Sequence, residues 1–165
     1  MTKNASSIIK ENDPSAKIIL FGGLNLYSGD DIHLQLDKNF ASQLAAMNIA
    51  QYGSAISVHA YSWKGTDTPT QDVWDNYTQS LLYYQSLFLA KEIWLTETGQ
   101  EFDSSNENLQ AQYLLNSHQF FKGKVTHVFW YSLYDNSWEL PQKFGLVNID
   151  GTPRTAYNAM QTTAS

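Results

Sequence analysis

The apolar positions of the chain gather in four short runs, each bounded by turn signals, polar residues or glycine. The runs are AKIILFGG (16–23), AISVHAYSW (55–63), EIWLTETG (92–99) and VTHVFWYSLYD (125–135). Short, nearly continuous apolar runs closed by turn residues are typical of strands that are buried on both faces. The pattern therefore predicts four strands.

The segments between these runs have helical periodicity. Residues 40–53 place apolar side chains on one face, and Gly53 supplies a stop signal; the face consists of Phe40, Ala41, Leu44, Ala45, Met47 and Ile49. TPTQ (68–71) reads as a capping box with Pro69 at the first helical position. The helix that it opens should turn Val73, Trp74, Tyr77, Leu81 and Phe88 inward. A third helix is expected from Ser104, with Glu107 three residues on, to Phe121, and a shorter one after Pro153.

Strand and helix thus alternate four times along the chain. This order favours parallel strands joined by right-handed helical crossovers. A chain of 165 residues with 42% hydrophobic content can bury a sizeable core. We expect an α/β fold that forms one domain over residues 1–165.

Composition and charge narrow the possible partners. Sixteen acidic residues against ten basic ones give a net charge of -6, and no Lys/Arg-rich segment could follow a phosphate backbone, so nucleic acid is an unexpected partner. No apolar run is long enough to cross a bilayer, and MTKNASSIIKENDPSAK has no signal-peptide pattern, so localisation stays undetermined. There are no cysteines, and the four histidines are scattered. We expect no metal and no cofactor.

One carboxylate, Glu97, stands at the end of its predicted strand, just ahead of Gly99. The carboxyl ends of parallel strands border the crevice in which α/β folds bind ligands, so this position favours a functional acid. His59 and Tyr61 lie two residues apart on one predicted strand and therefore share a face. The alternatives are a surface acid for Glu97 and a hydrogen-bonded core histidine for His59.

Three motifs in order resemble the second half of a known enzyme fold. ISVHAYSW (56–63), IWLTETG (93–99) and VFWYSLYD (128–135) with FGLVNIDGTPRTAYNAM (144–160) resemble the sixth, seventh and eighth strands of (β/α)₈ retaining glycoside hydrolases. The resemblance is to cellulase-, xylosidase- and arabinofuranosidase-like members, which carry the acid/base after strand four and the nucleophile after strand seven. It covers roughly residues 15–161 and implies half of a TIM barrel, strands five to eight.

The resemblance implies roles for individual residues. Glu97 would be the nucleophile that forms a glycosyl-enzyme intermediate. His59 and Tyr61 would line the sugar site, with the tyrosine hydroxyl orienting Glu97. Trp130 would form the apolar floor under a sugar ring, although core packing is an equal alternative for a large aromatic side chain. Asn25, which follows Gly22 and Gly23, is a weaker candidate for contact with a sugar hydroxyl.

A retaining glycosidase also needs a proton-donating carboxyl group, about 5–5.5 Å from the nucleophile. The resemblance places it in an Asn-Glu pair after strand four, and the chain is expected to begin after that point. Asn106-Glu107 is the one such pair, but it lies in a predicted capping box. Glu101 and Asp135, near strand ends, are better placed as substitutes.

Four strands would leave two sheet edges open, and neither edge sequence carries a proline or an inward charge. We therefore expect a homodimer that closes an eight-stranded barrel or, failing that, a complex with a separate amino-terminal half chain. Three functions stay open. The chain could be a glycosidase acting on carbohydrate once its missing half is restored or through a substitute acid, a catalytically inactive carbohydrate-binding or scaffold half-barrel, or a different α/β protein in which Glu97 is incidental.

Overall fold

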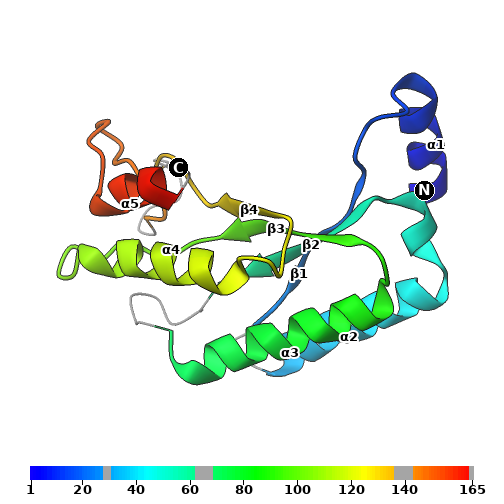
Figure 1. Ribbon diagram of the computed structural model, residues 1–165, viewed down its shortest axis with the longest axis horizontal. Helices are drawn as coiled ribbons and strands as arrows, with labels where there is room; N and C mark the ends of the chain where they lie inside the picture. The colour runs from blue at the N-terminus through cyan, green and yellow to red at the C-terminus, as the bar shows by residue number, and fades with distance from the viewer. Residues whose placement is uncertain (28–30, 62–68, 136–142, 164–165) are drawn as a thin grey trace.

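A computed structural model describes residues 1–27, 31–61, 69–135 and 143–163. Its four strands form one parallel sheet in the order β1-β2-β3-β4, and helices connect them (Figure 1). The elements in order are α1 Thr2–Asn12, β1 Ile19–Asn25, α2 Asp31–Ala46, the 3-10 helix η1 Ile49–Tyr52, β2 Ala55–Ala60, α3 Gln71–Leu87, β3 Glu92–Thr98, α4 Asn108–Phe121, β4 His127–Trp130 and α5 Thr155–Thr163. The predicted alternation of parallel strands and helices is confirmed.

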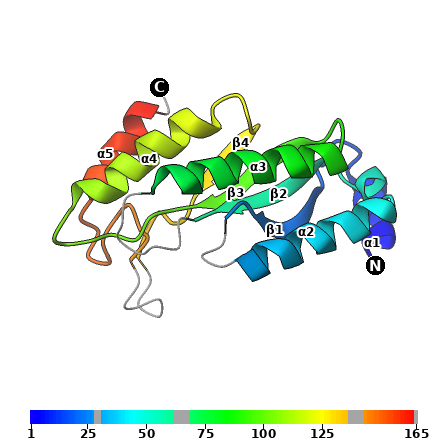
Figure 2. The same ribbon diagram turned by 90° about the horizontal axis from the view of Figure 1, so that it is seen from below.

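The main core lies between the sheet and the helices α2 and α3, which run side by side across one face (Figure 2). Val58 of β2 and Leu95 of β3 are fully buried there, as are Val73 and Tyr77 of α3. In these two strands the apolar side chains therefore mark the helix-covered face. Within the described residues, no helix combines the length and apolar character that crossing a bilayer requires.

Two of the predicted helix starts are wrong. α3 begins at Gln71, two residues after Pro69, and Thr70 is its N-cap, with a hydroxyl that donates to Asp72. Thr68, the first residue of the predicted capping box, lies outside the described residues. α4 begins only at Asn108, because Asp103 forms a local turn in which its carboxylate accepts the backbone N–H of Ser105 at 2.8 Å.

The helix after β1 also differs from the prediction. α2 begins at Asp31 and ends at Ala46, and the left-handed backbone of Asn48 (φ 56°) separates it from η1. The apolar period therefore does not continue through residues 40–53. Ala41 is fully buried as expected, but Phe40 and Met47 are 53% and 72% exposed.

The free edge of β1 is partly covered by a side chain from α2. The backbone N–H of Leu26 donates to the carbonyl of His59 on β2, so the N–H of the preceding residue, Asn25, points away from β2. The carboxylate of Asp37 accepts that N–H at 2.9 Å. A helix-borne acid, which the strand sequence does not contain, thus satisfies one backbone group on this open edge.

Candidate active site

A β-bulge in β3 turns Glu97 away from the helices. Leu95 pairs with Val58, and the next pair is Glu97 with His59, so β3 uses two residues where β2 uses one. The extra residue is Thr96, and its hydroxyl lies 2.5 Å from the hydroxyl of Ser57. Because the extra residue shifts the alternation, Glu97 lies on the same face as His59 rather than on the face of Leu95.

One carboxylate oxygen of Glu97, Oε2, lies close to the side chains of both Tyr61 and His59. The hydroxyl of Tyr61 donates to Oε2 at 3.0 Å, and Nδ1 of His59 lies 3.6 Å from the same atom. The Glu97 side chain keeps 40% of its surface exposed. The expected position of Glu97, at the carboxyl end of the sheet within hydrogen-bond reach of Tyr61, is confirmed.

The protonation of the two neighbours follows from their surroundings. Burial lowers the pKa of His59 below its ordinary value of 6.5, and this effect outweighs the opposite influence of the Glu97 and Asp37 charges. Burial, together with the charge of Glu97 and the hydrogen bond to it, raises the pKa of Tyr61 well above its usual range. Near neutral pH, Tyr61 therefore stays protonated and donates a hydrogen bond to Glu97, while the His59 imidazole is neutral.

The absence of a side chain at Gly23 leaves the space that the His59 ring occupies. Gly23 has a φ of 113°, which side-chain-bearing residues rarely adopt, and a β-carbon there would lie 2.2 Å from Nε2 of His59. The neighbouring Gly22 has no heavy atom within 4 Å of such a β-carbon. The close approach of β1 to the imidazole is thus specific to Gly23.

An aromatic group supports the ring of Tyr61. Phe144 lies edge-on to Tyr61, with ring centroids 5.9 Å apart, and 6.0 Å from the ring of Tyr131. All three approach Gly99, where a β-carbon would lie 2.4 Å from the carbonyl oxygen of Tyr131. Sequence reasoning missed Tyr131 and Phe144, although both fall inside the motifs that carry the family resemblance.

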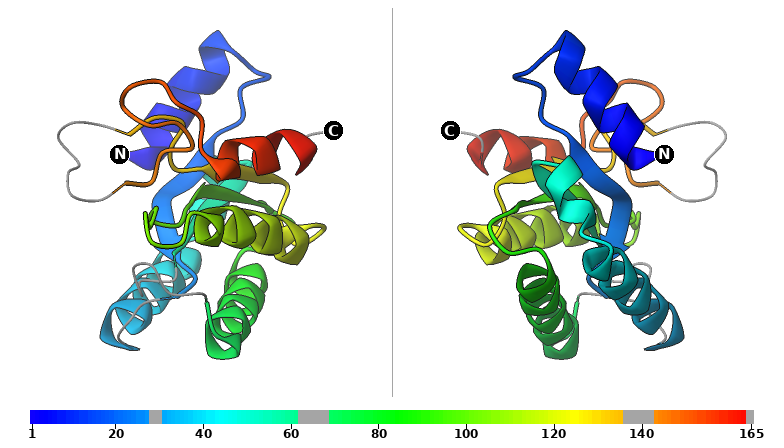
Figure 3. Two further views of the ribbon diagram at one scale, coloured as in Figure 1. Left: turned by 90° about the vertical axis from the view of Figure 1, so that its left-hand side faces the viewer. Right: turned by 90° about the vertical axis from the view of Figure 1, so that its right-hand side faces the viewer.

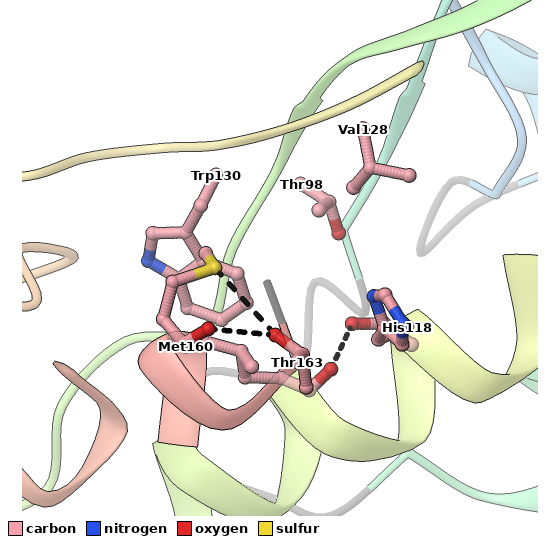
Figure 4. A pocket seen from close by; sticks show the side chains of 8 residues that line it. Thr98, His118, Val128, Trp130, Met160 and Thr163 are labelled. Carbon is pink, nitrogen blue, oxygen red and sulfur yellow. Dashed lines mark hydrogen bonds between the residues drawn. The ribbon is translucent and has the colours of Figure 1, made fainter. Parts of the chain in front are cut away.

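Trp130 lies among core side chains on the helix side of the sheet. Trp130 pairs with Thr98 in the sheet. The Thr98 hydroxyl donates to the carbonyl of Ala60 on β2 and lies 3.1 Å from the hydroxyl of Tyr113 on α4. The indole lies beside Met160 of α5 (Figure 4). Its N–H donates to the carbonyl of Phe144 at 3.3 Å. This environment corresponds to the packing interpretation of Trp130 rather than to a sugar platform beside Glu97.

Asn25 is held by α2. Its side-chain amide and its backbone N–H both donate to Oδ2 of Asp37, at 2.8 and 2.9 Å, and its carbonyl accepts from the hydroxyl of Tyr84 at 3.1 Å. Asn25 pairs with His59 in the sheet, so it borders the site. Contact with a sugar hydroxyl stays a prediction. No sequence pattern pointed to Asp37, because it comes from a helix.

The candidate substitutes for the acid differ in their surroundings. Asp135 forms a two-point ion pair with Arg154, Oδ1 to Nη1 at 3.1 Å and Oδ2 to Nη2 at 2.5 Å, with 7% and 2% of the side-chain surfaces exposed. Glu107 is the exposed N-cap residue of α4, away from any strand end. Glu101 is half-buried in the segment after β3. The ion pair gives Asp135 a structural role and argues against proton donation.

Nothing in the described part of the chain assembles a metal site. Among those residues, no three His, Asp or Glu side chains come close enough together to bind one ion. The side chains gathered around Glu97 at this edge of the sheet are a neutral imidazole and a phenol.

Comparison with known proteins identifies the fold. No family model and no curated protein matches the sequence. Similar solved structures include a family 39 glycoside hydrolase from the gut symbiont Bacteroides cellulosilyticus WH2, with 21% identity and a TM-score of 0.69 over 99% of this chain. They also include an intracellular xylanase from Thermoanaerobacterium saccharolyticum JW/SL-YS485, with 20% identity and a TM-score of 0.65 over 96% of this chain. A third is xylanase 10B from Thermotoga petrophila RKU-1 in complex with xylobiose, with 16% identity and a TM-score of 0.64 over 98% of this chain.

These likenesses show that the chain has the fold of part of a TIM-barrel glycoside hydrolase. The chain spans 36%, 48% and 50% of the lengths of those three proteins. The four parallel strands and their helices account for the matched portion.

Proposed function

We propose that this chain carries the nucleophile of a retaining glycoside hydrolase, and that Glu97 is that nucleophile. The observation that carries the proposal is the position of Glu97 on the face away from α2 and α3, with Oε2 bound by Tyr61 and beside His59. The xylanases among the similar solved structures support xylosides as the first substrates to test.

In the proposed reaction a Glu97 oxygen attacks the anomeric carbon of the sugar. The new carbon–oxygen bond forms as the glycosidic bond breaks, and the leaving oxygen takes a proton from a second carboxyl group. Water then releases the sugar from Glu97. Tyr61 binds Oε2 and His59 lies beside that atom, which favours Oε1 as the attacking atom. Tyr61, which keeps its proton, holds the carboxylate in orientation throughout.

The proposed reaction also needs a proton donor for the leaving oxygen, and Glu97 cannot fill that role while it acts as the nucleophile. Asp135 is committed to Arg154, and loss of general-acid assistance costs roughly 10²–10⁴-fold in rate. We therefore expect slow turnover of ordinary glycosides by the chain alone. Completion of the barrel, by a second copy or by a chain that holds strands one to four, would provide the remaining groups.

Covalent labelling tests the nucleophile without the missing acid. A 2-deoxy-2-fluoro-xyloside with a dinitrophenolate leaving group needs no protonation of that group, so Glu97 should form a stable adduct that intact-mass spectrometry detects. Glu97→Gln should form none, while the matched control Glu101→Gln should be labelled like the wild type. An adduct that persists in Glu97→Gln would transfer the role to another residue.

Complete absence of labelling in the wild type would favour the second candidate, a carbohydrate-binding or scaffold half-barrel without catalysis. The ion pair between Asp135 and Arg154 supports this alternative, because it makes Asp135 unsuitable as a substitute for the missing proton donor. Binding of xylo-oligosaccharides in a calorimetric titration, with no labelling, would be its signature.

A further inference from the structure

We propose that the pocket between α3 and α4, on the helix-covered side of the sheet, is a second carbohydrate site that binds an uncharged oligosaccharide. Its volume of about 340 Å³ falls within the range of about 300–1,000 Å³ that is usual for small-molecule sites. α4 lies on the same side of the sheet as α3 (Figures 1 and 3), and Phe121 of α4 shares one core with Val73 of α3. Because Glu97 lies on the other face, the pocket is separate from the candidate active site.

Two aromatic side chains form the apolar part of this pocket. Trp74 of α3 and Phe120 of α4 are half-buried, and their ring centroids lie 5.0 Å apart. The buried ring of Tyr113 stacks on Trp74 at 6.1 Å with 23° between the ring planes, and Nζ of Lys124 lies 4.3 Å from the centroid of Phe120. The indole is thus held in orientation from the core, and the part of it that lines the pocket can pack against the C–H groups of a sugar ring.

Polar side chains from both helices surround the two rings. Gln71 and Asp75 of α3 and Asn116 and Gln119 of α4 line the pocket, and all four are exposed. Nε2 of Gln71 donates to Oδ1 of Asp75 at 2.9 Å, so the amide and the carboxylate are already oriented beside each other. Within the described residues, the amides of Asn116 and Gln119 make no hydrogen bond. Each therefore offers a free donor and a free acceptor to a ligand.

The charges of the lining favour an uncharged ligand. Among the described residues that line the pocket, Asp75 is the only ionised group, so a phosphate or a uronic acid would face a carboxylate. Lys124, which lies over Phe120, donates to the carbonyl of Phe120 at 2.5 Å. A neutral sugar combines an apolar face with hydroxyl groups that both donate and accept. An indole bordered by amides and a carboxylate matches that combination.

The use of the site, but not the binding itself, rests on the proposed function. A polysaccharide held at α3 and α4 would raise the effective concentration of its other segments at Glu97. Because the pocket lies between two consecutive helices of this chain, oligosaccharide binding there requires neither catalysis nor another polypeptide.

Chemical-shift mapping by NMR tests the site on the isotope-labelled chain. The probes are xylohexaose and cellohexaose, two uncharged oligosaccharides, each titrated to millimolar concentration. At least one of them should shift the signals of residues 71–78 and 116–120, including the side-chain amides of Asn116 and Gln119. Any shifts at His59, Tyr61 and Glu97 report binding at the candidate active site separately.

Two variants assign the binding to the pocket. The double variant Asn116→Ala/Gln119→Ala should bind about tenfold more weakly, because hydrogen bonds from two side chains are lost. Trp74→Phe keeps an aromatic ring against the core but offers a smaller platform, so it should also weaken binding. The matched control is Gln85→Ala, because Gln85 is an exposed residue of α3 that does not line the pocket; it should bind like the wild type. Circular dichroism verifies that each variant is folded.

Three results would overturn the proposal. These are unshifted pocket signals with both sugars, unchanged affinity in both the double variant and Trp74→Phe, and tighter binding of hexagalacturonate, an acidic oligosaccharide. Failure of the proposed function would appear elsewhere, as absence of covalent labelling of Glu97 in the wild type.

Discussion

Replacement of Asp135 by Asn should destabilise the protein strongly, because Asp135 is one half of a buried ion pair. Arg154 also donates to the carbonyl of Gly145 at 2.5 Å and to Oδ1 of Asn148 at 3.0 Å, and its guanidinium lies 4.1 Å from the ring centroid of Phe102. Loss of one partner would leave this buried cation without its counter-charge. Such losses cost about 3–5 kcal/mol of unfolding free energy.

A change of that size is easily measured. For a chain of this length, each kcal/mol shifts the melting temperature by about 2–4 °C, so Asp135→Asn should melt roughly 6–20 °C lower. Urea unfolding followed by circular dichroism gives the free energy itself. The matched control is Lys17→Met, which breaks an exposed 2.6 Å pair with Glu92 whose side chains are 54% and 33% exposed. Its melting temperature and urea midpoint should stay close to those of the wild type, because exposed ion pairs contribute little to stability.

The opposite pattern would refute this reasoning. If Asp135→Asn unfolds at the wild-type urea concentration, the ion pair does not stabilise the segment after β4. If the variant also loses hydrolysis of unactivated glycosides but keeps labelling by the dinitrophenyl substrate, Asp135 would be the proton donor that we argue it is not.

Three further predictions concern the partners of Glu97. Because burial lowers the pKa of His59, its contribution to stability is complete above pH 6.5 and is lost as the pH falls through the folded-state value; His59→Gln should flatten this part of the urea-derived stability curve. Gly23→Ala should displace the imidazole and slow covalent labelling, whereas Gly22→Ala should leave the labelling rate unchanged. Tyr61→Phe should preserve the fold but lower the labelling rate by roughly 10- to 150-fold, since a hydrogen bond to a charged carboxylate, worth about 1.5–3 kcal/mol, is lost; an unchanged rate would exclude an orienting role.

The strands were predictable from sequence because each apolar run is short and ends at turn residues, although β4 is largely exposed in the structure and is not buried on both faces. The helix ends were not, since they depend on local hydrogen bonds that compete with one another. At Asp103 a side chain that bonds two residues ahead replaced the expected capping box, and a left-handed Asn48 ended the apolar period before it reached residue 53. Only neighbouring backbone geometry decides between such alternatives.

Among the site residues, those close together in sequence were predictable, and those that meet across distant segments were not. His59 and Tyr61 share a face because they are two residues apart in sequence, which alternation predicts. Asp37 was missed because it reaches Asn25 from a helix, across 12 residues of sequence. The ion pair between Asp135 and Arg154 spans 19 residues, and without it Asp135 reads as a free acid near a strand end.

A single inserted residue in β3 accounts for the orientation of Glu97. From Leu95 to Thr98, β3 advances three residues while β4 advances from Val128 to Trp130, only two. Thr98 therefore returns to the helix side, where Trp130 already lies because it is two residues after Val128 and shares its face. In a regular strand Glu97 would share the face of Leu95 and point toward the buried helices, where an unpaired carboxylate would be costly. The bulge at Thr96 thus places the carboxylate beside His59 and Tyr61, and strict alternation along the sequence would have assigned it to the wrong face.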